Sequence, residues 1–316
     1  MKQIRILWSI VCLILLFLST VIIFINVDKS RSILSIRSSN HDLSKSKLPN
    51  IYLIIVILSA AGNLEKREAI RKTWLSSDIS NVKHVFVIGE QDLKYDIHTI
   101  EAEIITYHDI LFLKNVSDSY DALTVKLLQS FVGVEKLWDF KFLLKTDDDS
   151  YVRLPSMISE LKSKYDHLTT LYWGFFDGSA HVKKAGKWKE SNWFLCDRYL
   201  PYALGGGYVL SQRLVQFIAH NSEYLNIYKT EDVSVGSWLS PLNITRVHDS
   251  RFDTEYKSRG CFNSYLVTHK HEPDDMRKIH SNLMSSGNLC EKEFQTRLSY
   301  TYNWTVLPSK CCIRNK

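Results

Sequence analysis

Three consecutive carboxylates, Asp147-Asp148-Asp149, directly follow an apolar segment at residues 141–145. Adjacent carboxylates repel one another and are costly to hold together unless a cation or hydrogen-bond donors compensate them. In an extended chain Asp147 and Asp149 point to the same side, so one can bind a metal ion while the other contacts a ligand. The alternative, a solvated acidic turn, is disfavoured because the triplet ends a predicted buried strand. An EF-hand loop is excluded because its required Gly and Glu are absent.

A second acidic pair, Glu231-Asp232, stands before Val233-Ser234-Val235-Gly236, where a short helix is predicted to begin. Carboxylates in a first helical turn interact favourably with the helix dipole, which is a sufficient structural reason for them. The functional alternative is a general base, that is, a carboxylate that removes a proton from an acceptor hydroxyl. The pair alone leaves both interpretations open.

Other residues are candidates with structural alternatives. Arg71, on an amphipathic helical segment, would either bind a nucleotide phosphate or brace the site. The glycines at 205–207 indicate either a tight turn or close approach of the backbone to a sugar ligand. His248 and His269 are candidate metal ligands, although a lone histidine is more often structural.

The elements that must position these residues alternate between strands and helices. Strands are predicted at residues 51–58, 84–89, 103–107, 141–145 and 171–176. Helices are predicted at residues 64–75 and 118–137, and from Pro155, Ser211, Glu231 and Pro273 onward. This alternation predicts an α/β fold with a mostly parallel, twisted sheet flanked by helices. Ligands of such sheets gather at the carboxyl ends of strands, where the acidic triplet lies.

The N-terminus predicts a membrane anchor. Residues 6–25 carry no charge, and a helix of this length spans a hydrocarbon core of about 30 Å. A cleaved signal peptide is disfavoured because no small-residue cleavage site follows. We therefore expect a cytoplasmic tail at 1–5, a transmembrane anchor at 6–27, a serine-rich lumenal stem at 28–48 and a lumenal catalytic domain at 49–316. Basic residues flank the anchor on both sides and do not decide its orientation.

The net charge of +6 is concentrated before the predicted domain. Residues 1–48 hold seven Lys and Arg against two Asp, a net charge of +5, which leaves +1 for the remainder. The folded part therefore has no general basic field for nucleic acid.

Cysteines and sequons place that domain in the secretory lumen. Five cysteines follow the anchor without a Cys-x-x-Cys pair, so two disulfides and one free thiol are expected, with the pairing left open among Cys196, Cys261, Cys290, Cys311 and Cys312. Glycosylation sequons occur at Asn115, Asn243 and Asn303. Together with the anchor they favour a type II topology.

Considered in order, these segments resemble the beta-1,3-glycosyltransferase family, which includes galactosyltransferases, N-acetylglucosaminyltransferases and fringe proteins. The family's motifs are matched by Arg67-x-x-Ile70-Arg71-x-Thr73-Trp74, Phe86-Val87-Ile88-Gly89, Asp118-Ser119-Tyr120-x-x-Leu123-Thr124, Lys145-x-Asp147-Asp148-Asp149, Gly205-x-Gly207-Tyr208 and Glu231-Asp232-Val233-x-x-Gly236. C-terminal segments, such as Arg251 to Cys261 and the closing Cys311-Cys312, are most similar to a galactosyltransferase of this family.

The resemblance implies a GT-A fold, inversion at the anomeric carbon, Mn²⁺ and residence in the Golgi membrane. It implies transfer of galactose from UDP-galactose to the galactosyl-xylosyl primer on a proteoglycan core protein, a step of glycosaminoglycan biosynthesis. Association with other enzymes of that linkage region would follow.

The resemblance also assigns roles to residues. Asp149 is expected to bridge the metal to the UDP pyrophosphate, and Asp147 to lie near the ribose or a basic group. Asp148 and Arg71 are further donor-site candidates, and Asp232 matches the catalytic base. His269 is preferred over His248 as the metal-side histidine.

Three rival functions remain open at this point. The nearest is N-acetylglucosamine transfer on the same fold. A non-catalytic, lectin-like membrane protein is disfavoured by the intact triplet and the Glu231-Asp232 pair. A calcium-binding adhesion module would need more numerous, loop-borne acidic residues.

Overall fold

The computed structural model describes residues 50–77, 79–90 and 97–314, all within one unit, Leu48–Lys316. The predicted tail, anchor and stem lie outside the described residues. Within those residues, no helix combines the length and the apolar character needed to cross a membrane.

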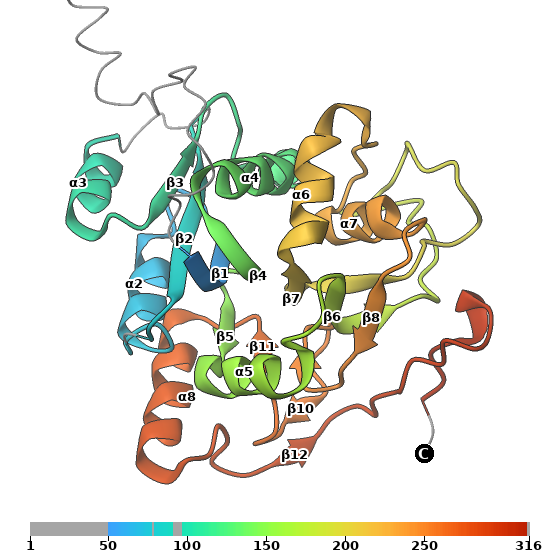
Figure 1. The fold of residues 1–316 in the computed structure, drawn as a ribbon. Helices are drawn as coiled ribbons and strands as arrows, with labels where there is room; N and C mark the ends of the chain where they lie inside the picture. Colours follow the sequence, from blue (N-terminus) through green and yellow to red (C-terminus); the bar gives the residue numbers. More distant parts are fainter. Residues whose placement is uncertain (1–49, 78, 91–96, 315–316) are drawn as a thin grey trace, which may run out of the picture. The chain divides into compact units, whose positions relative to one another are not determined.

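A seven-stranded sheet forms the centre of the unit, in the order β3-β2-β1-β4-β7-β6-β8 (Figure 1). Its strands are β1 Asn50–Leu58, β2 Val82–Gly89, β3 Ile110–Leu113, β4 Asp139–Asp147, β6 Leu171–Asp177, β7 Tyr202–Ser211 and β8 Thr245–His248. β7 runs against its neighbours β4 and β6, whereas the other paired strands are parallel. The prediction of an α/β, mostly parallel sheet is confirmed.

Both faces of this sheet are buried. In β1, Ile54 and Val56 belong to one core, whereas Leu53, Ile55 and Ile57 belong to the other, and all five are fully buried. Successive strand side chains point to opposite faces, so a strand covered on both sides becomes a continuous apolar run. This explains why residues 51–58 could be recognised as a strand from sequence.

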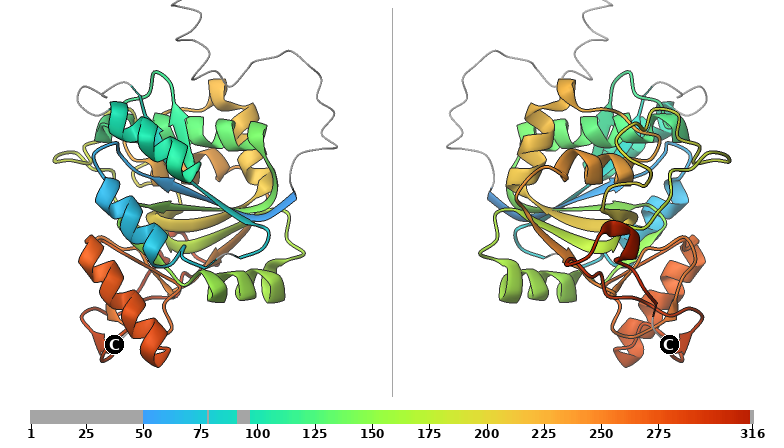
Figure 2. Two further views of the ribbon diagram at one scale, coloured as in Figure 1. Left: turned by 90° about the vertical axis from the view of Figure 1, so that its left-hand side faces the viewer. Right: turned by 90° about the vertical axis from the view of Figure 1, so that its right-hand side faces the viewer.

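Helices cover the two faces as two layers. The first core takes its helical side chains from α4 Leu123–Leu137, α6 Gln212–His220 and α7 Glu231–Leu239. The second takes them from α2 Leu64–Lys72, α5 Leu154–Glu160 and α8 Pro273–Ser286. Figure 2 shows these layers above and below the sheet edge. Within the described residues, α3 Ile97–Tyr107 is one further α-helix.

Two smaller sheets lie outside the central sheet. A three-stranded sheet has the order β5-β11-β9, and a two-stranded ribbon pairs β10 with β12. Their bounds are β5 Ser150–Val152, β9 Phe252–Asp253, β10 Gly260–Cys261, β11 Val267–His269 and β12 Phe294–Gln295. Short 3₁₀ turns lie at Tyr120–Ala122 (η2), Ser222–Tyr224 (η4) and Pro308–Lys310 (η5), and a π turn at Leu161–Tyr165 (η3) extends α5.

Two expectations about secondary structure are wrong. Residues 103–107 form the end of helix α3, and the strand is β3, which follows them. The helix buries Glu103, which forms ion pairs with Arg67 at 2.6 Å and Arg71 at 2.7 Å. Tertiary pairing thus overrides a short β-like pattern.

The second correction concerns the glycines at 205–207, which lie inside strand β7 rather than in a turn. A Cβ at Gly205 would overlap the carboxylate of Glu231, and one at Gly206 would lie 2.7 Å from the ring of His269. At Gly207 it would lie 2.9 Å from Val267. Glycine is therefore needed here because neighbouring elements pack closely on the strand.

Cysteine pairing, left open by the sequence, is resolved here. Cys261 pairs with Cys290, and the adjacent Cys311 and Cys312 pair with each other. Cys196 is a free, exposed cysteine. The three sequon asparagines, Asn115, Asn243 and Asn303, are all exposed, which leaves each accessible for glycosylation.

We expect Gly205→Ala to destabilise the protein by about 1–3 kcal/mol, because the added methyl group must displace Glu231. Thermal unfolding of the purified domain, residues 49–316, measures this. Gly62→Ala is the matched control, since a Cβ at Gly62 meets nothing within 4 Å. Equal stability of the two variants would contradict the packing argument.

Candidate active site

A pocket of about 540 Å³ opens beside the carboxyl end of β4. Its wall includes Asp147 from β4, Gly205 and Gly206 from β7, Asp232 from α7 and His269 from β11. Four separate elements thus contribute to one cavity. This is the edge of the sheet at which α/β proteins bind ligands.

The acidic triplet is divided by the chain geometry into three different environments. Asp147 is the last residue of β4, Asp148 and Asp149 form a two-residue turn, and β5 begins at Ser150. Asp147 lines the pocket and accepts a hydrogen bond from Lys145 Nζ at 2.8 Å.

Asp148 turns away from the pocket and ties β4 to the loop after β1. Its Oδ2 accepts hydrogen bonds from Ser59 Oγ at 2.7 Å and Asn63 Nδ2 at 2.8 Å. Its backbone N–H donates to the carbonyl of Leu58 at 3.1 Å. Asp148 is buried and is not part of the pocket wall, so its contacts are those of a structural anchor.

Asp149 carries a buried carboxylate oxygen, Oδ1, that has no hydrogen-bond partner. Burial, and then the charges of Asp147 and Asp148, raise the pKa of Asp149 to about 6. An orphaned buried carboxylate oxygen is unfavourable in the unliganded protein and would be stabilised by a bound cation.

In the pairing of β11 with β5, His269 lies opposite Ser150, the residue that follows Asp149. Burial and the adjacent Lys270 lower the pKa of His269 to about 4, so the imidazole is neutral, the form in which histidine binds metals. His248, by contrast, lies on β8 with both ring nitrogens engaged, by Phe176 N–H at 3.1 Å and the carbonyl of Tyr300 at 2.9 Å. The structure thus brings His269, and not His248, to the pocket.

Among the residues described, no three His, Cys, Asp or Glu side chains form a ready-made metal cluster. His269 lines the pocket, whereas Asp149 is not among the lining residues, so a cation held at Asp149 would complete its coordination with substrate phosphates and water. Mg²⁺-type sites commonly have that composition, with one or two protein carboxylates. The orphaned Oδ1 of Asp149 is the observation that favours this arrangement.

Asp232 faces the pocket from the first turn of α7. Its Oδ2 accepts a hydrogen bond from Gly205 N–H at 3.1 Å, and its Oδ1 accepts from Val233 N–H at 2.8 Å. Burial and the neighbouring Glu231 raise the pKa of Asp232 to about 7. A carboxylate with such a pKa, held on a pocket wall, is suited to accept a proton near neutral pH.

Glu231, immediately before Asp232, has a different role. It is buried, and its Oε1 accepts a hydrogen bond from Lys145 Nζ at 2.9 Å. Lys145 was a motif residue in the sequence with no assigned role. The sequence feature that could have indicated a role for Lys145 is its position inside an apolar strand, because a buried ammonium requires carboxylate or carbonyl partners.

Arg71 is not brought to the pocket. Its guanidinium binds Asp109 at 2.8 Å and Glu103 at 2.7 Å, and it lies over the rings of Phe86 and Tyr107. These contacts favour a structural role for Arg71 over phosphate binding, because its Nε and Nη2 donors are already bonded to carboxylates.

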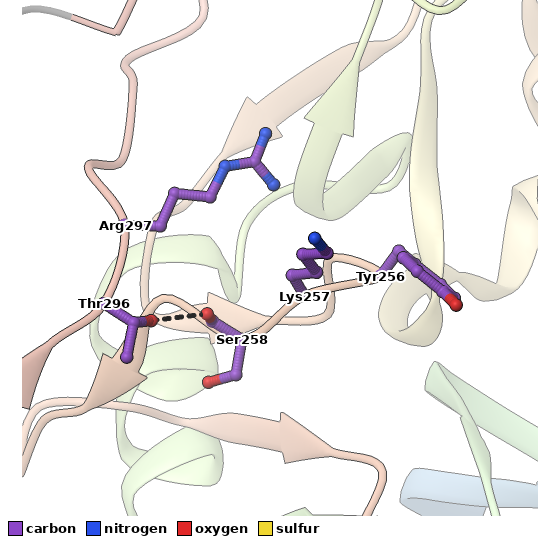
Figure 3. A pocket seen from close by; sticks show the side chains of 5 residues that line it. All are labelled: Tyr256, Lys257, Ser258, Thr296 and Arg297. Carbon is purple, nitrogen blue, oxygen red and sulfur yellow. Dashed lines mark hydrogen bonds between the residues drawn. The ribbon is translucent and has the colours of Figure 1, made fainter.

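A second hollow adjoins the pocket and shares Tyr256 and Arg297 with it. Figure 3 shows its other lining side chains, Lys257, Ser258 and Thr296, with Thr296 hydrogen-bonded to the carbonyl of Ser258. The ring of Tyr256 packs edge-on against Trp188 and lies under the Lys270 ammonium at 3.7 Å. The pocket therefore continues into an open, basic and aromatic surface.

Fold and pocket together define an α/β enzyme that binds its ligand at the strand ends. Residues 65–250 match the model of the family described as galactosyltransferase, and the chain belongs to this family.

Two sequence relatives and one solved structure are similar to this chain. Beta-1,3-galactosyltransferase 6 of Mus musculus is 44% identical over 271 residues, which cover 84% of this chain and 83% of that protein. UDP-GalNAc:beta-1,3-N-acetylgalactosaminyltransferase 2 of Xenopus laevis is 34% identical over 61% of this chain and 39% of its own length. Among solved structures, mouse xyloside xylosyltransferase 1 is a distant likeness, with a TM-score of 0.38 and 7% identity over 70% of this chain and 98% of that one.

We expect Asp232→Asn to lower kcat by about 10²- to 10⁴-fold, because the amide cannot accept the proton of an acceptor hydroxyl. Affinity for UDP should stay unchanged, since the substitution keeps the shape of the side chain. Steady-state kinetics and calorimetric UDP binding check the two parts. Turnover equal to that of the wild type would exclude Asp232 as the base.

The raised pKa of Asp232 predicts a pH dependence of kcat/KM. The carboxylate must be deprotonated to act as a base, so kcat/KM should fall about tenfold per pH unit below the pKa of about 7 and level off above it. The measurement is kcat/KM across this range, with thermal unfolding at each pH as a control for stability. A flat profile through pH 6 in folded enzyme contradicts the assignment.

Proposed function

We propose that the chain is an inverting beta-1,3-galactosyltransferase that moves galactose from UDP-galactose to the galactosyl-xylosyl primer of the proteoglycan linkage region. The observation that carries the proposal is that Asp147 and Asp232 line the same pocket. It is supported by the 44% identity to a beta-1,3-galactosyltransferase, over 83% of that relative's length. A GT-A arrangement of donor and acceptor sites is part of the same proposal.

The chemistry follows from the positions of the two acidic groups. Inversion requires one displacement, in which the acceptor oxygen attacks the anomeric carbon while the bond to the diphosphate breaks. Asp232 accepts the proton of the attacking hydroxyl, so no covalent nucleophile is needed. Asp147 lies on the same pocket, where it can orient the donor.

Mn²⁺ is the metal that the family resemblance implies, and Asp149 with His269 would hold it. When bound, the cation would neutralise the charge that develops on the leaving diphosphate. The protein's own contribution is a neutral imidazole and a carboxylate with a free oxygen at the end of β4.

The proposal includes a location and partners. A type II anchor at residues 6–27 would hold the domain in the Golgi lumen, where the sequons at Asn115, Asn243 and Asn303 can carry glycans. The protein partner would be a core protein bearing the primer on serine, and other enzymes of the linkage region could associate with it.

A donor and acceptor screen tests the function directly. We expect the purified lumenal domain to release UDP from UDP-galactose in the presence of a galactosyl-xyloside and Mn²⁺, with a new beta-1,3 linkage in the product. UDP-N-acetylglucosamine and UDP-N-acetylgalactosamine are the competing donors, because a relative is named for the latter. Preference for an N-acetylhexosamine donor would overturn the galactosyl assignment, and sugar binding without UDP release would favour a lectin.

The metal proposal has its own test. Asp149→Asn should abolish the Mn²⁺-dependent part of UDP affinity, measured by calorimetry with and without the metal. Asp148→Asn is the matched control, because Asp148 is held by Ser59 and Asn63 and should leave that dependence intact in folded protein. Retention of the metal dependence in Asp149→Asn would remove Asp149 from the donor site.

A further inference from the structure

The Lys145 side chain is fully buried, and its ammonium lies between the carboxylates of Asp147 and Glu231. Its Nζ donates to Asp147 Oδ1 at 2.8 Å, to Glu231 Oε1 at 2.9 Å and to the carbonyl of Gly205 at 2.6 Å. The three donors of the ammonium are thereby all used. One side chain on β4 therefore connects the strand-end carboxylate with the start of α7.

This contact depends on the surrounding sequence. Lys145 lies opposite Tyr208 in the pairing of β4 with β7, and Gly205 lies three residues before Tyr208. Because Gly205 has no Cβ, the carboxylate of Glu231 can reach across β7 to Lys145. Asp232, the next residue, is then held against Gly205 N–H at 3.1 Å.

We propose that Lys145 is a positioning residue of the transfer reaction: by binding Asp147 and Glu231 at once, it sets the place and the charge of the base Asp232 relative to the donor side. Lys145 does not touch the reacting atoms in this assignment. The inference rests on the proposed function, in which Asp232 is the base, and deepens it.

The charges around Asp232 show how Lys145 would act. Glu231 on the same helix raises the pKa of Asp232, and Lys145 on β4 lowers it. Asp232 also interacts with tyrosines whose pKa values are raised, and which are therefore uncharged near neutral pH: Tyr120, Tyr172, Tyr199, Tyr202 and Tyr208. The other charged side chains that line the pocket are Lys183, Lys187, Lys270, Arg297, Asp147, Asp177 and Glu255.

Lys145 itself remains charged. Burial alone would lower its pKa, but Asp147 and Glu231 raise the pKa above its usual value. Removing this cation leaves Glu231 buried without its ion-pair partner, which should push the proton affinity of Asp232 upward. Removing Glu231 should have the opposite effect.

The experiment compares Lys145→Met, Glu231→Gln and the double variant with the wild type. We expect the acidic limb of the kcat/KM profile to move to higher pH in Lys145→Met and to lower pH in Glu231→Gln, each by about one pH unit or more. The double variant, which removes one charge of each sign, should lie between the two. A residue that only supports the fold would lower stability without moving the limb in opposite directions.

A direct titration keeps the test independent of turnover. The carboxyl signal of Asp232 in ¹³C-labelled protein, assigned by its loss in Asp232→Asn, reports the same pKa in every variant. Opposite displacements in Lys145→Met and Glu231→Gln support the inference. An unmoved Asp232 titration in folded variants overturns it. If Lys145→Met does not fold alone, the double variant is compared with Glu231→Gln, because these two differ only in the Lys145 cation; an equal Asp232 titration in both then overturns the inference.

The same data separate the two hypotheses. A wild-type protein that transfers no sugar, but whose Asp232 titration moves as expected, would overturn the proposed function and keep the charge coupling. Transfer by the wild type with an unmoved titration would overturn the role of Lys145 and keep the proposed function.

Discussion

The pocket depends on one buried ion-pair network, in which the ammonium of Lys145 is shared by Asp147 and Glu231. Desolvating a cation costs several kcal/mol, and only well-placed opposite charges and hydrogen bonds offset that cost. Here the partners come from the end of a central strand and from the start of a helix, where Glu231 lies 86 residues after Lys145. The pocket can therefore form only when β4, β7 and α7 are packed together.

Two of the three adjacent aspartates have partners that compensate their charge. Asp147 is paired with Lys145, and Asp148 is satisfied by Ser59 and Asn63. Only Asp149 keeps a buried oxygen without a partner. A triplet that looks uniform in sequence thus separates into a charge-paired residue, a structural anchor and a residue left available for a cation. The turn between β4 and β5 produces this separation, because it rotates the chain between consecutive residues.

The parts that sequence could predict are those governed by local periodicity. The run at 51–58 is apolar at every position because both faces of β1 are buried, and that pattern has few alternatives. Residues 103–107 were predicted as a strand, but so short a pattern does not distinguish a strand from a helix. The helix is favoured by the ion pairs of Glu103 with the α2 arginines Arg67 and Arg71. For the glycines at 205–207 the sequence left a tight turn or a close backbone approach open. Their cause is the close approach of Glu231, His269 and Val267, which no local pattern records.

The candidate site was predictable in its residue types but not in its division of roles. Asp147, Asp232 and His269 were identified from their motifs and do meet at one pocket. Arg71 was also identified, yet its charge is used by Glu103 and Asp109. A motif match shows that a charged residue is present. Its function depends on which oppositely charged side chains lie within contact distance in the fold, and this is not visible in the motif. Lys145 illustrates the converse, since its role became visible only when β4, β7 and α7 were placed together. A charged residue inside a strand is more informative the more deeply it is buried, because a buried charge needs partners. Where those partners come from separate elements, the cluster is a candidate functional site.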